Sequence, residues 1–290
     1  MSGSNKKANI NLFILTLLLL SFTVEGRAFS FHCEEDSIAA LHLLATAESA
    51  GDNYGKRIVA VAGAMEGIKG KTLPDVDTTI SLTVNLHEIN PLQFVNNAMA
   101  FAFVAGKQNA TLSDYGKKLE DLSRKKGVDN GFPSHLFYGA EWIGDNIYRG
   151  NLQEMTEYLT GGGFRTKTLD YLSRHRNEIS VMKDSVVNEN IRMNEMGYRG
   201  HRIPHLKKQS IGNKSMQELL QEGDIIMMLS PAEDYDVYDI GIVGFKNGEP
   251  FLIHIDRTTG QVVSDPYPLS RLFKVEGQHF YGYRWLRPNE

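Results

Sequence analysis

The spacing of apolar residues changes along the chain, and this change restricts the fold more than any other feature of the sequence. Between residues 37 and 126, apolar residues recur mostly at intervals of three and four, which is the spacing of one helix face. From residue 223 onward, short runs rich in β-branched and aromatic residues follow one another closely. Helices followed by strands predict an α+β domain, with a helical first half packed on an antiparallel sheet formed by the second half.

Four helices are predicted in the first half, over residues 37–50, 54–65, 91–106 and 112–126. Asn90 and Pro91 mark the start of the third helix, because Asn caps helices and the missing N–H of Pro costs nothing at the first helical position. The apolar face of this helix is wide, so we expect it to lie in the core. Residues 78–86 alternate apolar and polar residues and predict a half-buried strand or an extended edge.

Five strands are predicted in the second half, over residues 225–229, 237–245, 250–255, 260–263 and 280–285. Asn247 and Gly248 predict a tight turn between the second and third of them, so the strands form a meander. Gly161, Gly162 and Gly163 predict another turn. They lack the Lys and the helix start of a phosphate-binding loop, and we do not expect them to bind phosphate.

The N-terminus has the composition of a secretory signal peptide. Lys6 and Lys7 precede an apolar run of about 13 residues, and small residues follow at Gly26 and Ala28. A membrane-spanning helix needs about 20 apolar residues, so cleavage is favoured over anchoring. We therefore predict a signal peptide over residues 1–28 and a single domain over residues 29–290. The protein is expected to be exported, either periplasmic or secreted, without stable membrane insertion.

Charge and cysteine content exclude several classes of function. The formal net charge of −4 provides no overall attraction to nucleic acid. The single cysteine, Cys33, cannot form an internal disulfide, a CxxC redox pair or a thiolate zinc site. His201 and His205 have the spacing of metal ligands on a helix, but Pro204 between them argues against that helix. No metal and no cofactor are predicted.

Three segments of the sequence resemble one known family. Residues 84–102 look like its strand, turn and nucleophile helix, residues 135–146 like its aromatic segment, and residues 220–256 like its paired strands. The chain resembles exported bacterial proteins described as N-acetylmuramoyl-L-alanine amidase-like, which are related to NlpC-type cell-wall cysteine peptidases. The resemblance implies a papain-like fold, in which a cysteine at a helix start and a histidine on a neighbouring strand cleave an amide bond of peptidoglycan.

The departures from the family pattern fall on the catalytic positions. Pro91 stands where the family motif D-C-T-T-F-V-E has its cysteine, and Asp239 stands where the motif V-S-H-V-G-I has its histidine. Phe137 replaces a further histidine, whereas His254 matches one. Proline has no nucleophilic atom, and aspartate is not the neutral imidazole base that thiol chemistry uses. The resemblance thus implies a vestigial catalytic site at Pro91, Asp239 and His254.

Five residues are expected to line a groove beside this vestigial site: Asn90, Gln93, Phe137, Tyr138 and Trp142. The aromatic residues among them could equally be packing residues of the core, and so could His254. The groove would bind a peptidoglycan peptide or a cell-envelope protein.

Three functions remain open. The favoured interpretation is an inactive homologue of a peptidoglycan amidase or peptidase that keeps the groove. The second is an active cell-wall amide hydrolase with relocated residues, for example His254 and Asp239 activating water. The third is a structural or assembly protein with a closed groove, because Pro91 and its neighbour Leu92 fill the former nucleophile position. Cys33 lies about 58 positions before Pro91, where the family geometry offers it no base.

Overall fold

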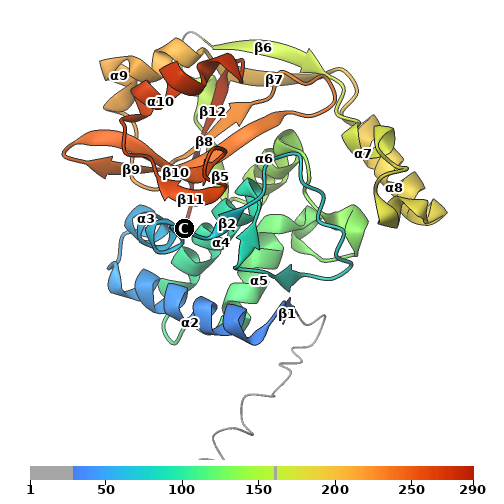
Figure 1. Cartoon of the computed structure of the whole chain (residues 1–290), viewed down its shortest axis with the longest axis horizontal. Helices are drawn as coiled ribbons and strands as arrows, with labels where there is room; N and C mark the ends of the chain where they lie inside the picture. The colour runs from blue at the N-terminus through green and yellow to red at the C-terminus, as the bar shows by residue number, and fades with distance from the viewer. Residues whose placement is uncertain (1–28, 160–161) are drawn as a thin grey trace, which may run out of the picture.

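The computed structural model of the protein describes residues 29–159 and 162–290 (Figure 1). The predicted signal peptide over residues 1–28 and the predicted turn residue Gly161 lie outside the described residues. In the part of the chain that is described, no helix combines the length and the apolar character needed to cross a membrane.

Strands of the described residues form a large mixed sheet with the order β4-β2-β11-β10-β9-β8-β12-β7-β6, and β5 pairs with β12. β2 and β4 pair in parallel, and the other pairs are antiparallel. The strands of this sheet are β2 (Lys69–Gly70), β4 (Glu88–Ile89), β5 (Leu152–Glu154), β6 (Gly162–Lys167), β7 (His201–Leu206), β8 (Ile225–Leu229), β9 (Val237–Lys246), β10 (Glu249–Asp256), β11 (Gln261–Ser264) and β12 (Tyr283–Pro288). A separate pair, β1 (Ser30–Phe31) and β3 (Thr83–Val84), is parallel.

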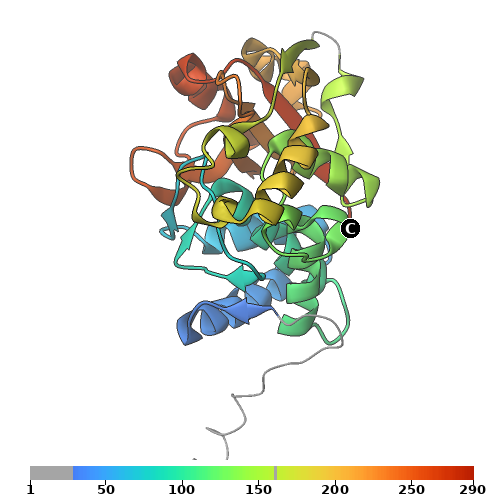
Figure 2. The same cartoon turned by 90° about the vertical axis from the view of Figure 1, so that its right-hand side faces the viewer.

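Helices lie on both faces of the large sheet (Figure 1). The helices are α2 (Glu34–Ser49), α3 (Tyr54–Ala64), α4 (Pro91–Ala105), α5 (Leu112–Ser123), α6 (Gly139–Tyr148), α7 (Tyr171–Arg174), α8 (Ser185–Met196), α9 (Lys214–Gln217) and α10 (Leu269–Val275). α3 and α4 pack on one face of β9 and β10. α10 contacts β10 on the opposite face. α7 and α8 lie at one side of the molecule, at the right of Figure 1, and face the viewer in Figure 2.

Two hydrophobic cores meet at strand β8, because successive side chains of a strand point to opposite faces. Ile225 and Met227 belong to the larger core with α4, whereas Ile226 and Met228 belong to the smaller core with α10. All residues of β8 are buried. The apolar run 225–229 is therefore a central strand covered on both faces.

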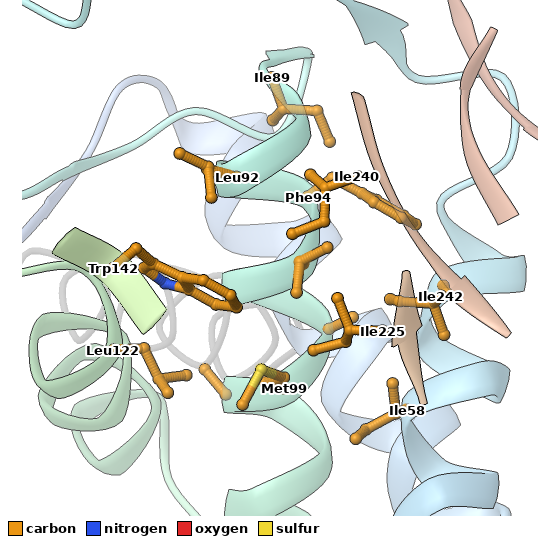
Figure 3. Close-up of a cluster of buried hydrophobic side chains, with 14 of the residues drawn as sticks. Ile58, Ile89, Leu92, Phe94, Met99, Leu122, Trp142, Ile225, Ile240 and Ile242 are labelled. Atoms are coloured by element: carbon orange, nitrogen blue, oxygen red, sulfur yellow. The ribbon is translucent and has the colours of Figure 1, made fainter. Parts of the chain in front are cut away.

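Helix α4 occupies the centre of the larger core, as its wide apolar face predicted. Phe94 and Met99 are fully buried, and Figure 3 shows Phe94 facing Ile240 of the sheet. Trp142 of α6 lies on another side of α4 in the same view. The helix starts at Pro91 because Asn90 and Gln93 form a reciprocal cap: each side-chain oxygen accepts a backbone N–H of the other at 2.9 Å.

Two features of the sheet differ from the prediction. It is mixed and not purely antiparallel, because β2 and β4 of the first half join its edge in parallel. The separation into helices and then strands is also incomplete, since α8, α9 and α10 follow in the second half. The predicted strands of the second half are otherwise present, with the last shifted to Tyr283–Pro288. Asn247 and Gly248 have φ of 53° and 81°, which confirms the predicted hairpin turn.

One local prediction holds only in part, and another is wrong. The segment 78–86 is a strand only at Thr83–Val84, because side-chain carboxylates replace strand partners on either side: Asp129 accepts the N–H of Leu82, and Asp36 accepts that of Leu86. Gly162 and Gly163 lie in strand β6 instead of a turn. A Cβ atom on Gly162 would stand 2.9 Å from the carbonyl oxygen of His205 on β7, so glycine permits the close approach of the two strands.

Candidate functional site

A cleft lies beside the N-terminal half of helix α4. Its walls come from separate parts of the chain: the segment that precedes β3, the start of α4, the segment between α5 and α6, helix α8 and the segment before β9. Four residues of the predicted groove line this cleft, namely Asn90, Gln93, Phe137 and Tyr138. The structure thus brings them together.

Trp142 does not line the cleft. Its side chain is fully buried, and its indole N–H donates to Oδ1 of Asn96 on α4 at 2.9 Å. The physical reason is the position of Trp142 on α6, four residues beyond Tyr138, where it packs against α4 (Figure 3). Trp142 is a core residue, which corrects its placement in the groove.

Carboxylates hold the two amides of the cleft in place. Asn90 Nδ2 donates to Asp75 at 3.2 Å, and Gln93 Nε2 donates to Asp77 at 3.3 Å. Both acids also line the cleft. The side-chain oxygens of Asn90 and Gln93 already cap α4, so both the oxygen and the nitrogen of each amide are hydrogen-bonded. The wall that they form is therefore preorganised.

Four buried polar atoms at the cleft have no hydrogen-bond partner among the described residues. They are Nε2 of His135, Oε2 of Glu195, the hydroxyl of Tyr235 and Nε of Arg124, although this last atom lies 3.5 Å from the carboxylate of Asp129 in an ion pair. The other carboxylate oxygen of Glu195 accepts the hydroxyl of Tyr138 at 2.6 Å, so Glu195 is held in place while one oxygen stays available. A buried polar group without a partner costs about 1–3 kcal/mol, and a bound water, ion or ligand that supplies the partner removes this cost.

Burial also sets the protonation of two groups in the cleft. Burial, with a contribution from the charge of Arg124, lowers the pKa of His135 to about 4, so its ring is neutral at pH 7. Burial raises the pKa of Glu141, although Lys125 Nζ lies 2.6 Å from its carboxylate and opposes that shift. The cleft therefore combines a neutral imidazole with acidic groups.

The predicted vestigial site lies outside the wall of the cleft. Pro91 is the first residue of α4, and Asp239 on β9 faces His254 on β10. Nδ1 of His254 is 2.8 Å from Oδ2 of Asp239, and its Nε2 is 3.8 Å from Oδ2 of Asp265. The structure thus joins Asp239 and His254 as a buried pair and adds Asp265, which the sequence did not indicate.

The two carboxylates decide the charge of His254. Burial by itself would lower the pKa of His254, but the hydrogen bond to Asp239 and the nearby charge of Asp265 outweigh it and raise the pKa to about 10. The ring is then an imidazolium at neutral pH, with a carboxylate facing each nitrogen. An imidazolium has no free lone pair and cannot act as a general base.

A second cluster surrounds Cys33, the residue before helix α2. Its Sγ lies 3.2 Å from Oδ2 of Asp36 and 3.8 Å from Nδ1 of His87, and that nitrogen lies 2.7 Å from Oδ1 of Asp36. These three side chains could hold a metal ion, so the inference that a single cysteine cannot take part in a thiolate zinc site is too strict. The family geometry offered Cys33 no base, but the structure places His87 beside it. The contact depends on the pairing of β1 with β3. Each of these strands has only two residues, so the sequence carries no recognisable pattern for it.

Solved structures share this fold. An N-acetylmuramoyl-L-alanine amidase from Bacteroides uniformis superimposes with a TM-score of 0.66 at 20% identity, over 87% of this chain and 100% of the amidase. A protein from Bacteroides fragilis, proposed to be a xylanase, has a TM-score of 0.65 at 25% identity, over 77% of this chain and 96% of its own. A protein from Legionella pneumophila has a TM-score of 0.66 at 13% identity, over 88% of this chain and 96% of the Legionella chain.

Comparison with curated proteins yields no significant match. A family model described as N-acetylmuramoyl-L-alanine amidase-like does match residues 68–276, which include the cleft and the pair of Asp239 and His254. This match confirms the resemblance found in the sequence. Because it extends over more than half of the sequence, the chain belongs to the AmiA-like family of N-acetylmuramoyl-L-alanine amidase-like proteins.

Proposed function

We propose that this protein is a non-catalytic member of its family that binds peptides of the bacterial cell wall in the cleft beside α4. The observation that carries the proposal is three of the unpartnered buried atoms at the cleft, those that have no ion pair either: Nε2 of His135, Oε2 of Glu195 and the hydroxyl of Tyr235. A ligand that supplies their partners would recover the free energy that the free protein loses there.

The chemistry of these atoms favours a ligand that carries amide groups. The Tyr235 hydroxyl can donate to a carbonyl oxygen, and the Glu195 carboxylate can accept from an N–H. Phe137 and Tyr138 add aromatic surface beside them. Stem peptides of peptidoglycan offer amide donors, amide acceptors and short aliphatic side chains. The amidase from Bacteroides uniformis supports this ligand class by analogy of fold alone.

Two observations support the absence of catalysis. Pro91 occupies the first position of α4, where the family resemblance expects the nucleophile, and proline carries no atom that could attack a carbonyl. His254 is an imidazolium between Asp239 and Asp265, so it cannot deprotonate a nucleophile or water. The second interpretation, with His254 and Asp239 activating water, would need that histidine to be neutral.

The proposal also includes a papain-like arrangement and export. The start of α4 and the packing of α4 on β9 and β10 support the first, because papain-like enzymes place a helix start against a sheet in this way. The basic start and the apolar run in residues 1–28 support the second.

The sharpest test removes one hydroxyl. Tyr235→Phe should weaken binding of purified muropeptides about fivefold, which corresponds to roughly 1 kcal/mol, when measured by isothermal titration calorimetry. The same change should leave the free energy of unfolding unchanged or raise it, because the lost hydroxyl has no partner in the free protein.

Tyr281→Phe is the matched control. Its hydroxyl is also buried and unpartnered, but Tyr281 does not line the cleft. This variant should bind muropeptides as the wild type does. Equal affinities for all three proteins would place the ligand elsewhere, and no retention of the wild type on peptidoglycan sacculi would favour a structural role with a closed groove.

A further inference from the structure

We propose that Cys33, Asp36 and His87 form a binding site for Zn²⁺ that is separate from the cleft. The three residues offer a thiolate, a carboxylate and an imidazole, which are the ligand types that zinc uses in proteins. One ligand atom from each side chain lies within 4.8 Å of the others. The fourth position would be taken by water, since the side chain of His87 is 57% exposed.

The spacing of the donor atoms is close to that of a tetrahedral ion. Zinc binds sulfur, nitrogen and oxygen at about 2.0–2.3 Å, so neighbouring donors lie roughly 3.3–3.6 Å apart. Here Sγ of Cys33 is 3.8 Å from His87 Nδ1 and 3.2 Å from Asp36 Oδ2, while Asp36 Oδ1 is 2.7 Å from the same nitrogen. A small rotation of the exposed His87 ring, which moves Nδ1 by less than about 1 Å, would bring these distances to the tetrahedral range.

The geometry does not fit a cysteine–histidine–aspartate relay. In such a relay the nucleophile and the carboxylate contact different nitrogens of the imidazole ring. Here the thiol of Cys33 and the carboxylate of Asp36 both face Nδ1 of His87. Three donors that converge on one point are arranged for chelation and not for proton transfer along a chain.

The backbone orients the carboxylate before any ion binds. Asp36 is fully buried, and its Oδ1 accepts the N–H of Leu86 at 2.7 Å while its Oδ2 accepts the N–H of Cys33 at 3.2 Å. Such outer hydrogen bonds fix the ligands of metal sites. Glu34 and Glu35 in the same helix turn add negative charge that favours a cation.

The proposed ion would join two segments that are distant in sequence. Cys33 and Asp36 follow strand β1 and begin helix α2, whereas His87 follows strand β3. The short parallel pairing of β1 with β3 aligns the segments, and the ion would add three bonds across them. Zinc should therefore raise the stability of the folded protein, because the unfolded chain does not hold the three donors together.

The test uses the full-length protein without a polyhistidine tag. Competition with a chromophoric chelator should give one Zn²⁺ per chain, and zinc should raise the Tm. Substitution by Co²⁺ should give a thiolate-to-cobalt charge-transfer band. Loss of an outer hydrogen bond already weakens metal affinity about 10- to 100-fold, so Cys33→Ser and His87→Ala should each weaken zinc binding at least about 100-fold.

His42→Ala serves as the matched control, because His42 is an exposed histidine of α2 outside the cluster. Serine is a good helix cap, so Cys33→Ser should fold normally in the absence of zinc. Zinc that binds Cys33→Ser or His87→Ala as tightly as the wild type, or cobalt without the thiolate band, would overturn the proposal. So would a wild type that binds no zinc.

Discussion

At the level of single residues, the charge of His254 is the first feature to consider. His254 is a buried cation, because the carboxylates of Asp239 and Asp265 face its two ring nitrogens. The arrangement links protonation to stability. The pKa of His254 is raised from 6.5 to about 10 on folding, so the folded protein binds the proton more tightly than the unfolded chain does. Its contribution to stability is complete below about pH 6.5 and is lost as the pH rises toward 10.

Asp239→Asn should remove most of this effect. Breaking a buried ion pair by removing one partner costs about 3–5 kcal/mol, and we expect the lower part of that range because Asn keeps the hydrogen-bond geometry. Urea denaturation at pH 6 and pH 9.5 measures it: the difference in unfolding free energy between wild type and variant should be larger at pH 6. A difference that is equal at both pH values would show that His254 is neutral.

Cys33 shows why residue patterns predicted one cluster and missed the other. Asp239 and His254 lie on strands that the sequence predicts as neighbours, so their contact follows from the meander. The partners of Cys33 are Asp36, on the adjacent helix turn, and His87, which the two-residue strands β1 and β3 bring close. Strands this short leave no periodic signal in a sequence.

At the level of elements, the start of α4 is fixed by more than its cap. The Asn90 side chain accepts the N–H of Gln93 and also donates to Asp75, which lines the same cleft. α5 has a comparable capping box at Thr111, which bonds only within its own helix turn and is exposed. The two caps therefore separate the contribution of capping from that of the link to the cleft.

Asn90→Ala should lower the free energy of unfolding by about 2 kcal/mol, against about 1 kcal/mol for Thr111→Ala. The excess arises because Asn90 is buried and its loss leaves Asp75 without that partner. Chemical denaturation of the three proteins gives both numbers. If Thr111→Ala is the more damaging change, the cap of α4 is not reinforced by the loop that carries Asp75.

Elements with a strong local signal were predicted, and those defined by distant partners were not. The cap of α4 and the turn at Asn247 and Gly248 are read from adjacent residues. The segment 78–86 has the alternation of a strand, yet Asp36 and Asp129 take its backbone groups. Strand pairing depends on which partner the rest of the chain supplies, and no local pattern encodes that partner.

At the scale of the whole molecule, the cleft is assembled from segments that the sequence separates widely. Asp75, Asn90, Phe137, Glu195 and Tyr235 come from five parts of the chain. The family resemblance indicated the parts around Asn90 and Phe137. It did not indicate the wall formed by α8, which lies at one side of the molecule (Figure 1). Periodicity alone places no residue at a cleft.

The wild type should release no new amino or carboxyl ends from purified peptidoglycan, and Pro91→Cys should also be inactive. A thiol at the start of α4 would still lack a neutral base, because His254 is protonated. Mass spectrometry of the soluble products detects either kind of new end. Products formed by the wild type and absent with His254→Ala would instead establish a hydrolase with relocated residues.

Strand β8 ties the two halves of the interior into one cooperative unit. Its odd-numbered residues, such as Ile225, complete the core around α4, and its even-numbered residues, such as Ile226, complete the core around α10. β9 and β12 hold it on either side. Loss of packing in either core would expose one face of β8 and so weaken the support of the other core. The molecule should therefore melt in a single transition, and its most slowly exchanging amides should lie in this strand.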